Sequence, residues 1–420
     1  MFSELISPTP WPAKAGSRTA IGPLAGCADA SCIAELASSK RLLLVVTPDT
    51  SSALALEREL PFFLEDDLPV LPFPDWETLP YDSFSPHQDI ISERLNTLYT
   101  LPGLHAGILI VPVPTLMHRL APRQYVSGSS LVLQTGQRLD PEQLRSDLQF
   151  NGYVNVDTVY EHGEFALRGS LVDLYPMGSP LPYRIDLLDD EVDTLRTFDP
   201  ETQRTIEKVD AINLLPAREY PMDAGAIQRF QMNWYDAFDV DPDQCTVYTE
   251  VSAGRSPGGC EYFLPLFFDD CGTLFDYLPA NAAVVAIGDH HGAAQHFWHE
   301  VNTRYEEYGI DPRRPLLPPS RCFTTVESLY ALLKRFAVLE LRHNPDAAVH
   351  VTSPSAEPPQ LLSGAGGSSG ADKLQAAGER DAAHDEKRAR DRDLLVLTDE
   401  VDEHRHGQYR AARAEQPETQ

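Results

Sequence analysis

The sequence predicts an α/β protein whose main sheet is parallel, with a small α+β domain in mid-chain and a mostly disordered C-terminal tail. Apolar runs alternate with helix-like segments in residues 1–124 and again in 217–341. Short strand-like segments separated by turn residues occupy 125–216, and the composition changes once more at 342–420. Strands that alternate with helices are typical of a parallel, doubly wound sheet.

The first part of the chain supplies the start of that sheet. Continuous apolar runs, typical of strands buried on both faces, lie in 41–47 and 107–112, and a shorter strand is expected at 67–73. The segments with helical spacing are 28–36, 51–60 and one that starts at 115–120. The sequence Pro48-Asp49-Thr50 offers an N-cap to the second of these helices.

The middle segment opens with a helix signal. Asp140 is placed as an N-cap, Pro141 stands at the first helical position and Gln143 is a capping-box partner. Short strands separated by turn residues follow, at 153–159, 164–168, 171–175, 183–188 and 192–198. This pattern predicts a small α+β domain with an antiparallel sheet.

The third part returns to mixed α/β character. A strand is expected at 282–287, and helices are expected at 291–308 and 326–336. The proline-rich residues 315–319 predict a stiff turn between these two helices.

The last part, 342–420, differs in composition. It has one aromatic residue, Tyr409, and no isoleucine, and a glycine–serine stretch lies at 364–370. Such a composition cannot bury enough apolar surface to offset the entropy of the chain. We therefore expect this tail to be mostly disordered, with a hint of a strand only at 394–397.

Charge and cysteine usage narrow the function and the compartment. The net charge is −29, and an acidic protein repels nucleic-acid phosphates, so DNA binding by the chain alone is not expected and a partner with a basic surface is favoured. The six cysteines form no CxxC pair, and residues 1–16 lack a signal-peptide core. No apolar run approaches the ~20 residues that span a bilayer. We expect a cytoplasmic protein without membrane contact.

The first strand–helix connection is where a nucleotide site would lie. A phosphate-binding loop reads GxxxxGK[ST], in which amides hold phosphate, the lysine neutralises it and the hydroxyl binds magnesium. Residues 26–33 read GCADASCI, so Gly26 matches the first glycine only, and Asp29 adds a negative charge where phosphate would sit. The residues in place of the second glycine, the lysine and the hydroxyl residue are Ser31, Cys32 and Ile33. ATP hydrolysis is therefore not expected.

Other signals of catalysis are weak: the sequence contains no HExxH motif, and we expect no nucleophile elbow. A histidine group consists of His290, His291, His296 and His299. We interpret it as a solvated helix face, with a metal site as the alternative. The acids at 189–191 are most simply a solvated hairpin turn, with acid–base catalysis as the alternative. We predict no catalytic residue and no metal ligand.

Three stretches carry a family resemblance. Residues 75–95 read DWETLPYDSFSPHQDIISERL, and residues 309–319 read GIDPRRPLLPP. Between them, 161–176 read EHGEFALRGSLVDLYP and 183–192 read YRIDLLDDEV. Together they resemble the bacterial transcription-repair coupling factors, up to about residue 341.

The resemblance implies an architecture and a partner. The N-terminal region of that family is similar to the excision-repair protein UvrB. It implies a helicase-like parallel-sheet domain without a nucleotide site, formed by 1–124 and 217–341, with a UvrA-binding domain inserted at 125–216. ATP, magnesium, DNA and RNA polymerase would bind only domains C-terminal to these.

The function that the resemblance implies is a non-catalytic scaffold that recruits UvrA in transcription-coupled nucleotide excision DNA repair. Two alternatives stay open: an ATP-dependent DNA translocase that works only as part of a full-length protein, and an inactive remnant. The sequence departs from the family after about residue 341, for which a truncated or frameshifted gene product is the simplest hypothesis.

In the family, two arginines and a bulky apolar residue of the inserted domain contact UvrA. The matching positions are Arg168, Arg184 and Leu188. Arginine beside an exposed apolar residue is the composition of an interface hot spot. Gly169 predicts a bulge or bend directly after Arg168. Family members commonly have an aromatic residue at the position of Leu188, and leucine loses ring area and stacking.

The alternation of side chains along strand 183–188 assigns its two faces. Ile185 and the residues two positions to either side of it are expected in the core, which leaves Arg184 and Leu188 exposed on the other face. The alternative for Arg184 is a surface ion pair with Asp186 or Asp189, which would contribute little stability.

Overall fold

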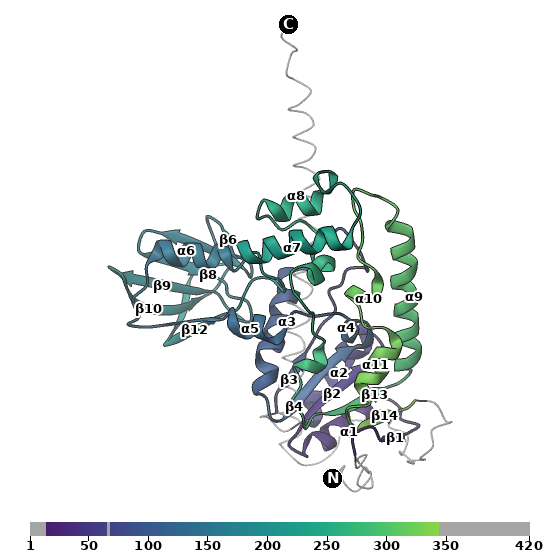
Figure 1. Ribbon diagram of the computed structural model, residues 1–420. Helices are drawn as coiled ribbons and strands as arrows, with labels where there is room; N and C mark the ends of the chain where they lie inside the picture. Colours follow the sequence, from purple (N-terminus) through teal and green to yellow (C-terminus); the bar gives the residue numbers. More distant parts are fainter. Residues whose placement is uncertain (1–13, 65–67, 344–420) are drawn as a thin grey trace, which may run out of the picture. The chain divides into compact units, whose positions relative to one another are not determined.

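The computed structural model describes residues 14–64 and 68–343 (Figure 1). Its main sheet is parallel throughout, with six strands in the order β1-β14-β13-β2-β4-β3. These strands are β1 Arg18–Ile21, β2 Leu42–Thr47, β3 Val70–Pro72, β4 Gly107–Pro112, β13 Ala283–Ile287 and β14 Val338–Leu341. The sheet therefore draws strands from both sides of the middle segment.

The apolar runs become the central strands because helices cover both faces of the sheet. Every residue of β2, β4 and β13 is buried. Leu43 and Val45 belong to the core shared with α1 (Ala28–Ala37) and α2 (Thr50–Phe63). The alternate residues Leu42, Leu44 and Val46 belong to the core on the other face, with α3 (Gln88–Thr100), α9 (His290–Tyr308) and α11 (Val326–Leu333).

The middle segment forms a second six-stranded sheet in the order β11-β10-β9-β8-β7-β6. Its strands are β6 Val154–Asn155, β7 Glu164–Arg168, β8 Leu171–Leu174, β9 Tyr183–Leu188, β10 Glu191–Phe198 and β11 Thr205–Val209. Four of its five pairings are antiparallel, as predicted, but β6 pairs with β7 in parallel, so the expected strand at 153–159 is reduced to two residues. A separate ribbon pairs β5 (Leu131–Gln134) with β12 (Ala211–Leu214).

One helix, α6 (Pro141–Phe150), lies against this second sheet (Figure 1). The Asp140 side chain caps it as predicted, since it accepts hydrogen bonds from the amides of Glu142 and Gln143. The expected capping-box role of Gln143 is wrong, because its side-chain amide donates to Asp147 (2.8 Å) one turn further along.

The other predicted helices are present, with one exception. The expected helix at 115–120 is the short α4 (Val113–Leu116), because His118 and Leu120 form bridges to Phe323 and Gly272 instead. The remaining helices are α5 Arg123–Gly128, α7 Ala224–Ala237, α8 Thr246–Ser252 and α10 Pro319–Cys322. Single 3₁₀ turns or short 3₁₀ helices lie at Leu101–Gly103, Pro242–Gln244, Cys260–Leu266 and Leu274–Asp276.

The structure thus confirms a mixed α/β fold with a parallel main sheet. Most of the predicted tail, residues 344–420, lies outside the described residues, and so does the strand hinted at 394–397. Within the described ranges, no helix combines the length and the apolar character needed to cross a bilayer.

Candidate functional site

The three predicted contact residues lie on two neighbouring hairpins of the second sheet. The strand register places Asp173 of β8 directly opposite Arg184 of β9, and Thr194 of β10 opposite Asp186 of β9. Partners that stand opposite one another share a face of the sheet. We call this side the arginine face, and it consists of Arg168, Asp173, Arg184, Asp186, Leu188 and Arg196.

The opposite side of the same sheet is the core side. Ile185 and Leu187 are buried as predicted, together with Val172 of β8 and Leu195 of β10. The apolar residues of α6 belong to the same core. The predicted core side of β9 is therefore confirmed for Ile185 and Leu187, whereas Tyr183 is only partly buried. The arginine face lies on the side away from α6.

Arg184 is not exposed, contrary to the sequence prediction. Its side chain is only 16% exposed because it makes a bidentate ion pair with Asp173, with Nε–Oδ1 and Nη2–Oδ2 distances of 2.7 and 3.0 Å. Its guanidinium also lies 4.7 Å from the ring centroid of Phe198 and donates to the Gln203 carbonyl. The hydrogen bonds to Asp173 raise the pKa of Arg184 above its ordinary value. The predicted alternative partners, Asp186 and Asp189, are wrong.

Arg168 is the accessible arginine of the pair, with 45% of its side chain exposed. Its Nη2 donates to the Asp157 carbonyl (2.8 Å) and lies 3.6 Å from Oδ2 of Asp173. The prediction of a bulge or bend at Gly169 is wrong, because the strand ends at Arg168. Gly169 opens the two-residue turn between β7 and β8, where its φ of +65° suits glycine.

Leu188 stands at the end of β9 and is 68% exposed, as predicted. The next two residues, Asp189 and Asp190, form the tight turn to β10, and both are exposed. The interpretation of these acids as a solvated hairpin turn is therefore confirmed. Leu188 therefore lies as an exposed apolar side chain at the edge of the arginine face, next to Asp189 and Asp190.

The sequence analysis missed the partners that organise these residues. Asp186 is paired with Arg196 and also accepts a hydrogen bond from the Thr194 hydroxyl (2.8 Å). Asp173, near the end of the quoted stretch 161–176, is 1% exposed and forms ion pairs with both arginines. The available signal was the period-two placement of polar residues at Arg184 and Asp186 and again at Thr194 and Arg196, which puts all four side chains on one face once the hairpin is assumed.

In the degenerate nucleotide loop, residues 26–33, several side chains are either buried in the core or paired with another residue of the chain. Gly26 has a φ of +63°, but α1 begins only two residues later, so most of the residues that would form a phosphate loop are helical. Cys32 and Ile33 are buried in the core beneath the sheet, so their side chains cannot reach a phosphate. The Asp29 carboxylate binds Nε2 of His343 (2.6 Å), and burial raises the pKa of Asp29 despite this partner.

The predicted histidine group lies at and along α9. His290 and His291 contact the ring of Tyr330, with centroid distances of 6.1 and 5.1 Å. Across residues 14–64 and 68–343, no three or more His, Cys, Asp or Glu side chains are grouped to hold a metal ion.

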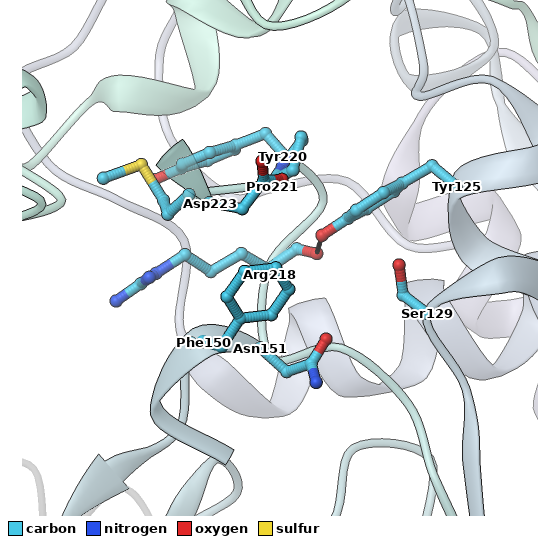
Figure 2. Close-up of a pocket in the computed structure, with 10 residues that line it drawn as sticks. Tyr125, Ser129, Phe150, Asn151, Arg218, Tyr220, Pro221 and Asp223 are labelled. Carbon is cyan, nitrogen blue, oxygen red and sulfur yellow. Dashed lines mark hydrogen bonds between the residues drawn. The ribbon is translucent and has the colours of Figure 1, made fainter. Parts of the chain in front are cut away.

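A small pocket of about 80 Å³ lies where the middle segment joins the rest of the fold (Figure 2). Its walls include Phe150 from the end of α6 and Tyr220 and Asp223 from the segment that leads into α7. The Tyr125 hydroxyl donates to the carbonyl of Arg218 (3.1 Å), the dashed contact in Figure 2. The Asp223 carboxylate already accepts hydrogen bonds as the N-cap of α7. We therefore interpret the pocket as part of the packing between the middle segment and the rest of the fold.

The other two quoted stretches pack against each other and do not lie on the arginine face. The Tyr81 hydroxyl donates to the Leu317 carbonyl (2.9 Å), and Arg314 donates to the Tyr81 carbonyl (2.9 Å). Arg94 forms a buried ion pair with Glu219 (2.8 Å), which also accepts a hydrogen bond from Trp76 Nε1. These stretches therefore hold the fold together.

Comparisons with known proteins agree with this arrangement. Residues 131–220 match the UvrB interaction domain family. The chain is 48% identical over 343 residues to the transcription-repair-coupling factor of Escherichia coli (strain K12), covering 81% of this chain and 30% of the relative. It is 42% identical over 327 residues to that of Haemophilus influenzae, covering 77% and 28%. The more distant Bacillus subtilis relative is 28% identical over 257 residues, covering 58% and 22%.

The chain spans less than a third of the length of each of these three relatives. The matched UvrB interaction domain segment includes the whole arginine face. The chain thus carries a segment of the UvrB interaction domain family and is similar to the transcription-repair-coupling factors over most of its length.

Proposed function

We propose that this chain is a non-catalytic scaffold that recruits UvrA in transcription-coupled nucleotide excision DNA repair. The observation that carries the proposal is the arginine face, which lies within a UvrB interaction domain segment of a chain similar to transcription-repair-coupling factors. Arg168 offers an accessible guanidinium there, and Leu188 offers an exposed apolar side chain.

The chemistry of this face suits a protein partner. Arginine and aromatic residues carry much of the binding energy of protein interfaces. Arginine supplies directional hydrogen bonds, and an exposed leucine such as Leu188 supplies apolar contact area. The chain as a whole is strongly acidic, and the arginine face is a local cationic site. Such a site favours one orientation of an approaching partner protein over non-specific binding. We propose the contact set Arg168, Arg184 and Leu188, with Arg184 contributing mainly through its ordered position beside Arg168.

The test is a calorimetric titration of the chain with purified UvrA. We expect a 1:1 complex that Arg168→Ala and Leu188→Ala each weaken by about 1–3 kcal/mol. The matched control is Arg145→Ala, which removes an exposed arginine from α6, on the other side of the same sheet. If Arg168→Ala and Leu188→Ala bind as well as the control, the site is wrong. If the folded parent does not bind UvrA, the function is wrong.

We propose that the chain uses no nucleotide cofactor of its own. Three features support this proposal. Cys32 and Ile33 are buried, Asp29 places a negative charge where a phosphate would bind, and the Asp29 carboxylate is already hydrogen-bonded to His343. Contacts with ATP, DNA and RNA polymerase are assigned by the resemblance to other parts of the coupling factors. Saturable binding of magnesium-ATP to this chain would contradict the proposal and favour a residual ATPase.

A further inference from the structure

The most constrained group on the arginine face is not one of the predicted contact residues. The Asp173 carboxylate is 1% exposed, yet it lies at the centre of the face, between two guanidinium groups. Oδ1 and Oδ2 accept from Arg184 at 2.7 and 3.0 Å, and Oδ2 also lies 3.6 Å from Nη2 of Arg168. The register explains this geometry, because Asp173 stands opposite Arg184 on one side and Ala166 on the other, two residues before Arg168.

The pairing restricts both arginines before any partner arrives. A bidentate pair fixes the plane of the Arg184 guanidinium, and the Phe198 ring supports that plane at 4.7 Å. Arg168 is restrained through one nitrogen, Nη2, which donates to the Asp157 carbonyl and lies 3.6 Å from Oδ2 of Asp173. Arginine has many rotamers in solution, so a side chain that is ordered in advance loses less entropy on binding.

The charge balance of the group indicates what the partner must supply. Two guanidinium groups share one carboxylate, so one positive charge is left over, and Arg168 is the accessible carrier of it. A partner carboxylate bound to Arg168 would complete a row of four alternating charges, in which Arg168, Asp173 and Arg184 are the other three. A partner cation at the same place would meet repulsion.

We propose that Asp173 is a positioning residue for the UvrA-binding arginines, and that the partner places a carboxylate against Arg168. The proposal rests on the function proposed above and deepens it. Asp173 itself makes no contact with the partner, because its carboxylate lies behind the two arginines.

The first test compares Asp173→Asn with Asp186→Asn in calorimetric titrations against purified UvrA at high ionic strength, where long-range attraction is screened. Both substitutions remove one carboxylate from the same face, but Asp186 holds Arg196 instead of the proposed contact residues. We expect Asp173→Asn to weaken binding about tenfold, which corresponds to about 1.4 kcal/mol, and Asp186→Asn to change it less than about twofold. Equal effects of the two substitutions would overturn the positioning role.

A double-mutant cycle separates positioning from general destabilisation. If Asp173 acts through the arginines, Asp173→Asn causes no further loss in the Arg168→Ala/Arg184→Ala background, whereas a merely structural role adds the same loss in every background. Arg184→Lys serves as a second variant if Asp173→Asn does not fold. It keeps the charge but cannot form the bidentate pair, so we expect a similar loss, and parent-like binding would overturn the proposal.

The outcomes also distinguish this inference from the function on which it rests. If Arg168→Ala leaves the affinity for UvrA unchanged, the proposed site itself is wrong. If Arg168→Ala weakens binding while Asp173→Asn does not, the site stands and the positioning role of Asp173 fails. The partner carboxylate is tested by Arg168→Glu, which we expect to weaken binding more than Arg168→Ala does; an equal loss would contradict a carboxylate at that place.

Discussion

Charged side chains that lose nearly all contact with solvent must be compensated inside the fold, and this chain does so in different ways. Asp173 is compensated by two arginines, and Arg94 by the single carboxylate of Glu219. Glu261 is also buried, but its side chain accepts a hydrogen bond from the neutral Ser85 hydroxyl (2.9 Å). A hydroxyl stabilises a carboxylate less than a guanidinium does, so burial dominates and raises the pKa of Glu261 to about 7.

We expect Glu261 to make the stability of the fold depend on pH. Its ordinary pKa is 4.5, so between pH 4.5 and about 7 the folded state holds a proton that the unfolded chain has released. Stability therefore falls as the pH rises through this window. Glu261→Gln cannot ionise, and we expect it to gain about 3 kcal/mol relative to the parent between pH 4.5 and pH 8. Urea denaturation across this range checks it, and parallel pH profiles would contradict it.

At the same scale, the sequence predicted part of the candidate site. The alternation along β9 was enough to expose Leu188 and to bury Ile185, because side-chain direction in a strand follows from position alone. The burial of Arg184 was not predictable in this way. It depends on Asp173, which lies on a different strand and becomes a neighbour only through the register between β8 and β9.

The individual helices show how a local signal sets where an element begins. The Asp140 carboxylate accepts from the amides of Glu142 (2.9 Å) and Gln143 (3.4 Å), which have no acceptor within the first turn of α6. Asp49 does the same for α2 through the amide of Ser52. Such caps can be recognised from three or four consecutive residues, so both helix starts were predicted correctly.

Removal of the α6 cap is expected to lower the free energy of unfolding by about 1 kcal/mol, because the amides of Glu142 and Gln143 lose their side-chain acceptor. The variant is Asp140→Ala, measured by thermal and chemical denaturation. The control is Gln143→Ala in the same turn, which removes only the bond to Asp147 and should cost less. If the two substitutions cost the same, the cap contributes nothing specific.

The elements that were missed lack such local signals. Helix α3 buries the polar residues Ser92, Arg94 and Thr97 along with its apolar ones, so an apolar stripe of helical spacing is hard to see in the sequence. The edge strand β1 has four residues and only one of them is buried. The strand expected at 153–159 is reduced to the two residues of β6, and its pairing with β7 ends at the hydrogen bond from the Val156 amide to the Phe165 carbonyl. Tertiary contacts decided each of these cases.

In the molecule as a whole, a buried polar cluster ties the segments before and after the second sheet to each other. Arg94 Nε donates to Glu219 (2.8 Å) and Nη1 donates to the Pro74 carbonyl, while Trp76 Nε1 donates to the other carboxylate oxygen of Glu219. The Arg94 guanidinium lies 4.3 Å from the ring centroid of Phe73. This cluster joins residues more than a hundred positions apart, so it forms only when both parts of the chain are in place.

We therefore expect Arg94→Ala to destabilise the fold by about 3–5 kcal/mol, since it leaves the Glu219 carboxylate buried without its cation. Tryptophan fluorescence during urea denaturation measures the change. The control is Arg145→Ala, whose ion pair with Glu142 is at the surface and is expected to matter little. A loss in Arg94→Ala no larger than in the control would show that the cluster does not support the fold.

The contacts at the junction pocket have a consequence for how such a protein could arise. The chain leaves the parallel-sheet part near Tyr125 and comes back near Arg218, and these two points are joined by a 3.1 Å hydrogen bond. Leu131 and Leu214, slightly further along each path, are paired strand residues. A segment whose two ends meet can be gained, lost or exchanged by recombination without re-routing its host, at an entropic cost that grows only slowly with its length. From the geometry of this junction we expect that the segment between Tyr125 and Arg218 could be exchanged in this way.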